Sequence, residues 1–171
     1  MMDIHIKPVQ PSDADWILDV VRSWGADFVI SRARVIYPSR IDGFYAVDDE
    51  AKRLGLVTYE IIDDQCEIVT LDAFEKYQGI GTKLLDTVVH DATLRGCRRL
   101  WLITTNDNLE AMRFYQRRGL AVAAVYPGAL DTSRKLKPSI PLVGNYGIPM
   151  RDEIEFELVL HSPEADAAPL A

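Results

Sequence analysis

Lys76-Tyr77-Gln78-Gly79-Ile80-Gly81-Thr82 separates a predicted strand from a predicted helix. Several backbone N–H groups can converge on an anion there, because the first N–H groups of a helix have no partner within the helix. Gly79 and Gly81 can adopt backbone conformations that other residues avoid, and they place no Cβ in the path of a phosphate. The stretch therefore predicts binding of a pyrophosphate by main-chain groups.

The spacing of these two glycines argues against two common nucleotide motifs. The dinucleotide-binding fingerprint needs a third glycine, and this chain has Leu84 at that position. A Walker loop would end in Gly-Lys-Ser or Gly-Lys-Thr, which is also absent from this stretch. A Gly-x-Gly after a strand can also be present for steric reasons alone. At this point a module that binds another nucleotide stays open as an alternative.

The elements around the glycines follow from hydrophobic periodicity. Three apolar runs at 43–47, 54–62 and 66–71 are joined by acidic turns and predict an antiparallel meander. Apolar residues at helical spacing then predict a helix that ends at Arg95-Gly96. They are Leu84, Leu85, Val88, Val89, Ala92 and Leu94.

The remaining segments complete an α/β pattern. Strands are predicted at 4–6, 100–103, 121–125 and 154–160. Helices are predicted after Pro11 and after Asn108, each beginning at a residue that can cap it. Periodicity does not choose between helix and strand for 25–39. Residues 127–149 hold four of the nine prolines and are predicted to form a long structured loop.

Composition restricts the class of protein. The chain has 171 residues, 48% hydrophobic and 26% charged, so we expect one folded domain over 1–161 with a flexible tail at 162–171. The net charge of −7 argues against a nucleic-acid partner. We find no signal-like start and no membrane-spanning run, so we expect a cytoplasmic protein. Cys66, Cys97 and the three scattered histidines predict no metal site.

Two motifs resemble those of the GNAT acyltransferase superfamily. Lys76, Gly79 and Gly81 occupy the positions of its Arg/Gln-x-x-Gly-x-Gly/Ala motif, with lysine as a departure at the first position. Downstream, Asn108-x-x-Ala111-x-x-Phe114-Tyr115-x-x-x-Gly119-Leu120 is similar to the helix Asn-x-x-Ala-x-x-Leu/Phe-Tyr-x-x-x-Gly-Phe. The resemblance covers most of the chain from Ile4 to Leu160. It implies a mixed, mostly antiparallel twisted sheet, with helices on both faces and a splay between the fourth and fifth strands.

The resemblance also implies an activity. Such a protein transfers an acyl group, here expected to be acetyl from acetyl-CoA, to a primary amine by direct attack in a ternary complex without a metal. The acceptor would be a small-molecule or peptide amine, and a homodimer is an open arrangement. A non-catalytic acyl-CoA-binding sensor of the same fold is the alternative.

Site residues follow from the same resemblance. Tyr115 would protonate the departing thiolate, and Glu67 would accept the proton of the amine. Coenzyme A would be held by the splayed strand end, the glycine-rich stretch and two asparagines after the fifth strand: Leu71, Asp72, Ala73, Lys76, Tyr77, Gln78, Gly79, Ile80, Gly81, Thr82, Asn106 and Asn108.

Each of these residues also has a structural explanation. Tyr115 could be a packing residue of an apolar helix face, and Asn108 could be a helix cap without a ligand. Glu67 could lie on a solvated strand face. Arg134 in the 127–149 segment could hold an acceptor carboxylate, or it could belong to a solvated basic loop. Finally, Glu153, Glu155 and Glu157 would share one face of the last strand, which is more often a wet surface than a binding site.

Overall fold

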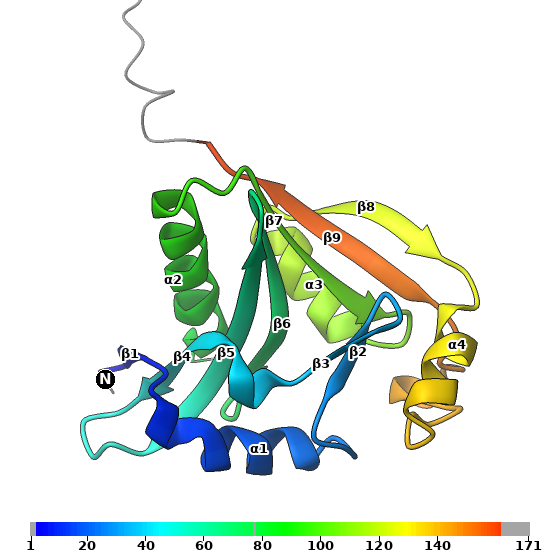
Figure 1. Cartoon of the computed structure of the whole chain (residues 1–171), viewed down its shortest axis with the longest axis horizontal. Helices are drawn as coiled ribbons and strands as arrows, with labels where there is room; N and C mark the ends of the chain where they lie inside the picture. The colour runs from blue at the N-terminus through cyan, green and yellow to red at the C-terminus, as the bar shows by residue number, and fades with distance from the viewer. Residues whose placement is uncertain (1–2, 77, 162–171) are drawn as a thin grey trace, which may run out of the picture. The chain divides into compact units, whose positions relative to one another are not determined.

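The computed structural model describes residues 3–76 and 78–161. These residues form two compact units. Figure 1 labels their helices and strands. The α2 unit comprises the described residues of 3–11, 41–100 and 159–161, and the α3 unit comprises 12–40 and 101–158. The predictions for Tyr77 and for the tail 162–171 lie outside the described residues, and the prediction of a single domain over 1–161 stays a prediction.

Four antiparallel neighbours form the sheet of the α2 unit. They are β1 (His5–Pro8), β4 (Asp42–Val47), β5 (Arg53–Ile62) and β6 (Gln65–Ala73), and they pair in this order. The acidic turns 48–50 and 63–64 connect β4 to β5 and β5 to β6. The meander predicted from the three apolar runs is therefore confirmed.

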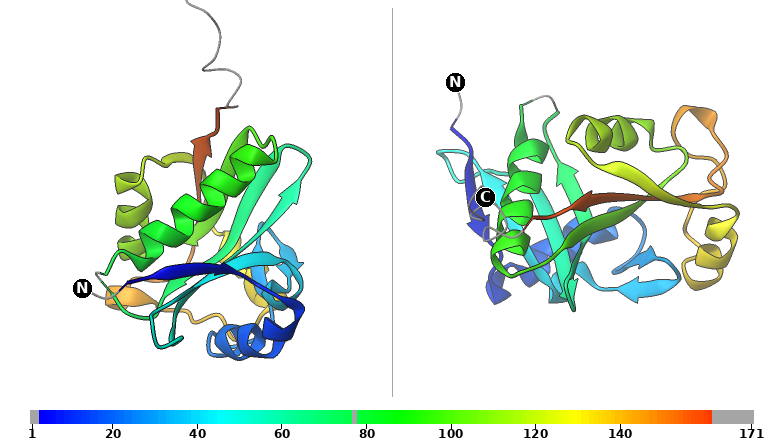
Figure 2. Two further views of the ribbon diagram at one scale, coloured as in Figure 1. Left: turned by 90° about the vertical axis from the view of Figure 1, so that its left-hand side faces the viewer. Right: turned by 90° about the horizontal axis from the view of Figure 1, so that it is seen from above.

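Helix α2 (Ile80–Leu94) packs on these strands, as Figures 1 and 2 show. Its buried residues are Ile80, Leu84, Leu85, Val88 and Ala92. Gly55 on β5 permits the close packing, because a Cβ there would lie 2.7 Å from the Asp72 carbonyl oxygen and 2.8 Å from Cγ2 of Ile80. Gly96 follows the helix with φ of +80°, which agrees with the predicted carboxy-terminal cap.

The α3 unit combines strands with three helices. Its larger strands are β7 (Arg99–Thr105), β9 (Glu153–Val159) and β8 (Ala121–Tyr126), in that order, and β8 is antiparallel to β9. Its helices are α1 (Ala14–Arg22), α3 (Leu109–Arg117) and α4 (Ala129–Leu136). Over the described ranges, the larger sheet has seven strands. The predicted mixed, mostly antiparallel α/β fold is confirmed, and the splay stays a prediction.

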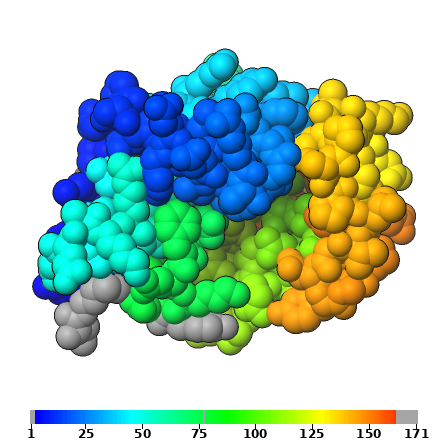
Figure 3. Space-filling model, turned by 90° about the horizontal axis from the view of Figure 1, so that it is seen from below, coloured from blue at the N-terminus to red at the C-terminus, as the bar shows by residue number. Residues whose placement is uncertain are grey.

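In the α3 unit, one segment was left unassigned by the sequence and a second differs from the sequence-based expectation. The unassigned segment 25–39 contains a hairpin of β2 (Val29–Ser31) and β3 (Arg34–Ile36). The segment 127–149, predicted to lack regular elements, contains α4, so that prediction was wrong. The prolines bracket the helix, because Pro127 precedes its N-cap Gly128 and Pro138 follows its C-cap Lys137. Figure 3 shows α4 (yellow) and the chain that follows it (orange) as one continuous surface.

Smaller features complete the description. Short 3₁₀ turns lie at Pro11–Asp13, Pro38–Arg40 and Asn145–Gly147. Cys66 and Cys97 are buried and unbridged. Within the described part of the chain, none of the helices is both long and apolar enough to span a membrane.

Candidate functional site

The start of α2 presents its first backbone N–H groups without a side-chain cap. Its N-cap residue is Gly79, which has a left-handed backbone (φ of 75°) and no side chain that could accept a hydrogen bond. A Cβ at Gly79 would meet no described atom within 4 Å. Ile80 is buried and anchors this end of the helix on the sheet. An anion can therefore approach the helix start closely, and the helix dipole favours negative charge there.

The charged side chains around this helix start leave it locally positive. Glu75 pairs with Lys52 on β5's amino-terminal side and also accepts a hydrogen bond of 3.1 Å from Nε2 of Gln78. Lys76, the residue after Glu75 in the chain, is exposed. Lys83, in the first turn of α2, donates to the carbonyl oxygen of Ile4 at 3.4 Å. Lys52 thus neutralises the charge of Glu75. Lys76 and Lys83 add positive charge to that of the helix dipole.

The end of β6 lies beside this helix start. The last residues of β6 pair with β5; they are Leu71, Asp72 and Ala73. The Asp72 carbonyl oxygen and the Ile80 side chain both lie close to Gly55 of β5, so this strand end and the helix start meet there. Burial raises the pKa of the Asp72 carboxyl. The structure therefore brings together the predicted strand end and the predicted phosphate-binding stretch within the α2 unit. A glycine inside a strand pattern was the signal in the sequence for this close approach.

Glu67 is buried on β6, with 2% of its surface exposed. The interpretation of Glu67 as a residue of a solvated strand face is therefore wrong. Two residues later the pairing of β5 with β6 shifts, so that Val69 forms a bulge between Ile68 and Thr70. The hydroxyl groups of Thr58 and Thr70 form a buried hydrogen bond of 2.7 Å at the bulge. Bulges re-aim side chains, and this one adjoins the candidate base.

Three consecutive polar residues follow β7 in the α3 unit. Asn106 accepts hydrogen bonds from the backbone N–H groups of Arg151 and Asp152 at 2.9 and 3.0 Å, and it donates to the Pro149 carbonyl at 2.9 Å. Asp107 is buried, and its carboxylate accepts from the Thr105 hydroxyl and the Asn145 N–H.

Asn108 is the N-cap of α3, and its side chain accepts from the Ala111 N–H at 3.3 Å. The turn after β7 is therefore held by Asn106 and Asp107, while Asn108 begins the helix that carries Tyr115. The predicted cap is confirmed, and the predicted contacts of both asparagines with coenzyme A stay predictions. Asp107 was missed by the sequence analysis, because its partners lie up to 38 residues away in the chain.

Tyr115 lies on the buried face of α3 with 8% of its surface exposed. Its ring packs against Phe114 and Phe156, with centroid distances of 5.5 and 5.9 Å. Burial raises the pKa of the phenol above its ordinary value. The hydroxyl therefore keeps its proton at neutral pH, which suits a proton donor and not a base.

Arg134 has a structural role that the sequence analysis did not predict. Its guanidinium donates to the carbonyl oxygens of Ile140, Pro141 and Met150 and also pairs with Asp131. Arg134 thereby ties α4 to the chain that follows it. The hypothesis that Arg134 holds an acceptor carboxylate is not supported by this geometry, and neither is a solvated basic loop.

The last strand does not present the solvated acidic face that the sequence predicted. The side chain of Glu153 is only 3% exposed and pairs with Arg32, while Glu155 accepts a hydrogen bond of 3.1 Å from the Tyr126 hydroxyl. Within residues 3–76 and 78–161, no group of three or more His, Cys, Asp or Glu side chains is arranged to hold a metal ion.

The candidate residues divide between the two units. Glu67, the end of β6 and the start of α2 belong to the α2 unit. Asn106, Asn108 and Tyr115 belong to the α3 unit. Each unit therefore holds part of the predicted chemistry, an anion-binding helix start in one and a protonated phenol in the other.

Known proteins are similar to this chain in sequence and in fold. A model of the Acetyltransferase (GNAT) family matches residues 15–120. The uncharacterized protein YdhI of Bacillus subtilis (strain 168) is 42% identical over 139 residues, which cover 81% of this chain and 87% of YdhI. The spermine/spermidine N(1)-acetyltransferase of the same strain is 30% identical over 145 residues, covering 76% and 93%. A crystal structure of a Bacillus subtilis acetyltransferase in complex with CoA has a TM-score of 0.66 at 17% identity, covering 94% and 100% of the two chains.

Proposed function

Because the chain belongs to the acetyltransferase (GNAT) family, we propose that it transfers an acetyl group from acetyl-CoA to a primary amine. The observation that carries this proposal is the start of α2, where Gly79 leaves the helix without a side-chain cap and with open space beside it. The pyrophosphate of coenzyme A fits such a site, since phosphates bind at helix N-termini. The relative named as a spermine/spermidine acetyltransferase supports an amine as the acceptor.

Residues of the α2 unit would hold the cosubstrate. The N–H groups of residues 79–82 would bind the pyrophosphate, with Lys76 adding positive charge. The main chain of Leu71, Asp72 and Ala73 would pair with the pantetheine arm and direct an N–H group at the thioester carbonyl. Such a fixed donor stabilises negative charge on the carbonyl oxygen during acyl transfer. Acetyl-CoA, when bound, supplies an activated acetyl group with coenzyme A as the leaving thiol.

The proton transfers would be carried by side chains. Glu67 would take the proton of the attacking amine, directly or through water, as the new C–N bond forms. Tyr115 would give its proton to the sulfur as the C–S bond breaks. Because burial raises the pKa of the Tyr115 phenol, its hydroxyl carries the required proton at neutral pH. No covalent bond to the protein is needed, so the amine and acetyl-CoA would be bound together.

A non-catalytic acyl-CoA-binding module is the alternative from a different functional class. A binding module would need the start of α2 but would not need a protonated phenol on α3. The presence of Tyr115 at the matching motif position favours the enzyme. We further propose a small-molecule or peptide amine as the acceptor, no nucleic-acid partner, and the cytoplasm as the place of action.

The test is a panel of amines assayed with acetyl-CoA by release of free thiol. The panel should hold polyamines, amino acids, aminoglycosides and a peptide with a free amino terminus. We expect turnover with at least one member. Coenzyme A binding by calorimetry together with no turnover over the whole panel would favour the binding module, and no binding of coenzyme A would contradict both.

A further inference from the structure

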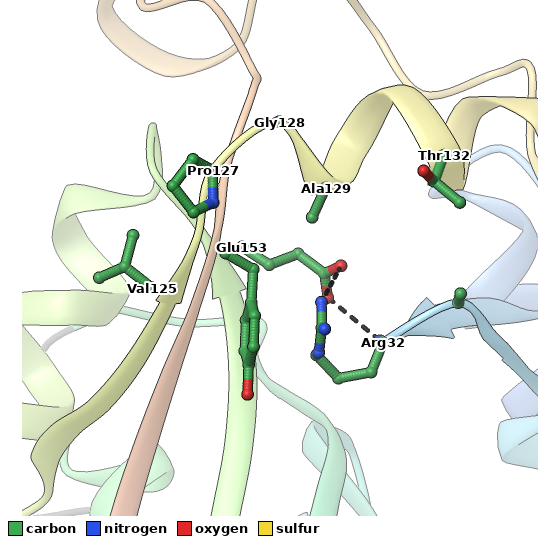
Figure 4. Close-up of a pocket in the computed structure, with 9 residues that line it drawn as sticks. Arg32, Val125, Pro127, Gly128, Ala129, Thr132 and Glu153 are labelled. Atoms are coloured by element: carbon green, nitrogen blue, oxygen red, sulfur yellow. Dashed lines mark hydrogen bonds and ion pairs between the residues drawn. The ribbon is translucent and has the colours of Figure 1, made fainter.

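The α3 unit contains a pocket of about 400 Å³ that the proposed chemistry does not use. It is lined by the turn between β2 and β3, the end of β8, the start of α4 and the start of β9. Figure 4 shows Arg32 entering from the β2–β3 turn, with Glu153 beside it and Ala129 and Thr132 of α4 nearby. This volume is in the range of small-molecule sites.

The backbone at Arg32 is held in an unfavourable conformation. Ser31 pairs with Arg34, so Arg32 and Ala33 form a two-residue hairpin corner. Both have positive φ, 48° and 61°, in a turn type that normally takes asparagine and glycine. Residues in such sparsely populated conformations are often found at functional sites. The hairpin thus projects an arginine side chain from a corner where glycine-rich sequences would be more favourable.

The side chain of Arg32 is also fixed. Its guanidinium carbon lies 3.3 Å from the centroid of the Tyr126 ring. The Glu153 carboxylate accepts from the Arg32 backbone N–H at 3.1 Å and lies 3.5 Å from Nη1. These contacts preorganise the guanidinium before any ligand arrives.

The accessible charge of the pocket is the positive one. The side chain of Arg32 is 36% exposed, whereas that of Glu153 is 3% exposed. Glu153 meets the guanidinium through one nitrogen at a long distance, which is not the two-bond arrangement that a carboxylate and an arginine prefer. The N–H donors on the free side of the planar Arg32 guanidinium, here called the fork, can therefore still receive a second carboxylate. The Tyr126 ring lies against one face of the guanidinium.

Both positive and negative groups surround the positive charge of Arg32. The first turn of α4 contributes the positive end of its dipole and the Thr132 hydroxyl. Asp152 accepts from the Gly128 N–H at 2.8 Å, and Glu155 is engaged by the Tyr126 hydroxyl. These two adjacent acids are thus bonded to protein groups, and the Arg32 guanidinium is the more exposed of the two charged groups that line the pocket.

We propose that this pocket binds a small organic molecule through its carboxylate, which pairs with the guanidinium of Arg32. The Thr132 hydroxyl donates a hydrogen bond to the same ligand. Binding at this site does not depend on acetyl transfer. If the proposed transfer holds, the ligand is either the amine acceptor, which would then be amino-acid-like, or an effector.

Calorimetric titration of the full chain tests the proposal. The ligands are glycine, glutamate, succinate and benzoate, each paired with the corresponding primary carboxamide. We expect at least one carboxylate to bind and its carboxamide to bind at least about tenfold weaker, because the fork prefers a charged bidentate partner. Arg32→Lys keeps a positive charge for the buried Glu153 but removes the fork, and it should lose at least about tenfold in affinity.

A matched control separates the fork from general effects of arginine replacement. Arg40 also lies over a tyrosine ring, that of Tyr37, at 4.5 Å but outside the pocket. Arg40→Lys should leave carboxylate affinity unchanged, and thermal unfolding of both variants establishes that they fold. No binding by any carboxylate, equal binding of a carboxylate and its carboxamide, or equal affinity in Arg32→Lys would overturn the proposal.

The same titrations distinguish this site from the proposed function. Gly79→Ala should weaken coenzyme A binding and leave carboxylate binding intact. If the carboxylate pocket fails, acetyl transfer to an amine without a carboxylate is unaffected. If a bound carboxylate that carries an amine is consumed with thiol release, it is the acceptor, and if it only changes the rate with another amine, it is an effector.

Discussion

At the scale of single residues, Tyr115 is the position where packing and chemistry are hardest to separate. Its ring is buried against Phe156, and burial raises the pKa of its phenol. Replacement by phenylalanine keeps the ring and removes only the proton donor. We expect Tyr115→Phe to lower kcat about 100-fold with unchanged affinity for coenzyme A, because general acid catalysis contributes at least about this factor.

Steady-state kinetics with any amine that turns over checks this prediction. Tyr37→Phe removes the hydroxyl of an exposed tyrosine and should leave kcat unchanged. If Tyr115→Phe retained full kcat, the hydroxyl would have no part in proton transfer and the residue would be a packing residue only.

Asp72 allows a prediction about pH. Burial raises the pKa of its carboxyl in the folded state, so the folded protein binds this proton more readily than the unfolded chain does. The contribution to stability is therefore present below the unfolded pKa, near about 3.9, and is lost as the pH rises through the folded pKa. At neutral pH the charge on this partly buried carboxyl destabilises the fold.

Asp72→Asn should accordingly increase the free energy of unfolding at pH 7, and the increase should shrink as the pH falls through the raised folded pKa and be absent below about 4. Urea unfolding at several pH values measures this. A gain of the same size at every pH would show that packing and not charge is responsible, and a loss at pH 7 would contradict the predicted sign.

The sequence predicted the role of a side chain where its hydrogen-bond partner lies close in the chain. It did not predict the role where the partner lies far away. Asn108 was correctly predicted as a cap, since its partner Ala111 is three residues away. Arg32 and Glu153 are 121 residues apart, so neither the burial of Glu153 nor the pocket beside it could be inferred from the chain. Arg134 has its carbonyl partners 6, 7 and 16 residues further along the chain, in an irregular segment whose path periodicity does not predict.

At the scale of elements, the hairpin of β2 and β3 shows why the segment 25–39 resisted prediction. Its corner is Arg32-Ala33, and neither residue signals a turn. Ala33→Gly should raise the free energy of unfolding by about 1 kcal/mol, because a left-handed backbone costs an L-residue roughly that amount relative to glycine.

Chemical denaturation measures this gain, with Ala121→Gly as the control. Ala121 lies in strand β8, where glycine should lower the free energy of unfolding by about 0.5–1 kcal/mol. An unchanged or lower stability for Ala33→Gly would mean that the positive φ of 61° at Ala33 carries no strain.

Helices with apolar spacing and glycine at their ends were predicted well. The apolar positions Leu84, Leu85, Val88 and Ala92 are buried on α2 as expected. Helix α4 was missed because prolines and glycines are dense around it and only Leu130 supplies a large buried side chain. Proline density alone is thus a poor argument against a helix when the prolines lie at its ends.

At the scale of the whole molecule, the proposed function requires an acidic chain to bind an acidic cosubstrate. The net charge is −7, so the attraction for coenzyme A has to be local. In our proposal the start of α2 would meet this need with N–H groups that have no side-chain cap and with the lysines Lys76 and Lys83, and the pocket of the α3 unit would use Arg32 in the same way. The family was predicted from two motifs, whereas the pocket could only be found in the structure.

The central claim is that the α2 start binds the pyrophosphate of coenzyme A, and titration calorimetry of two variants tests it most directly. Gly79 and Gly96 lie at opposite ends of α2, both with positive φ and both with no described atom within 4 Å of an added Cβ. Each change to alanine should therefore cost about 1–2 kcal/mol of stability, a similar amount at both ends. We predict that Gly79→Ala weakens coenzyme A binding at least about tenfold, because its Cβ enters the path of the phosphates, while Gly96→Ala binds as the unaltered protein does. Equal affinity in the two variants would contradict the account.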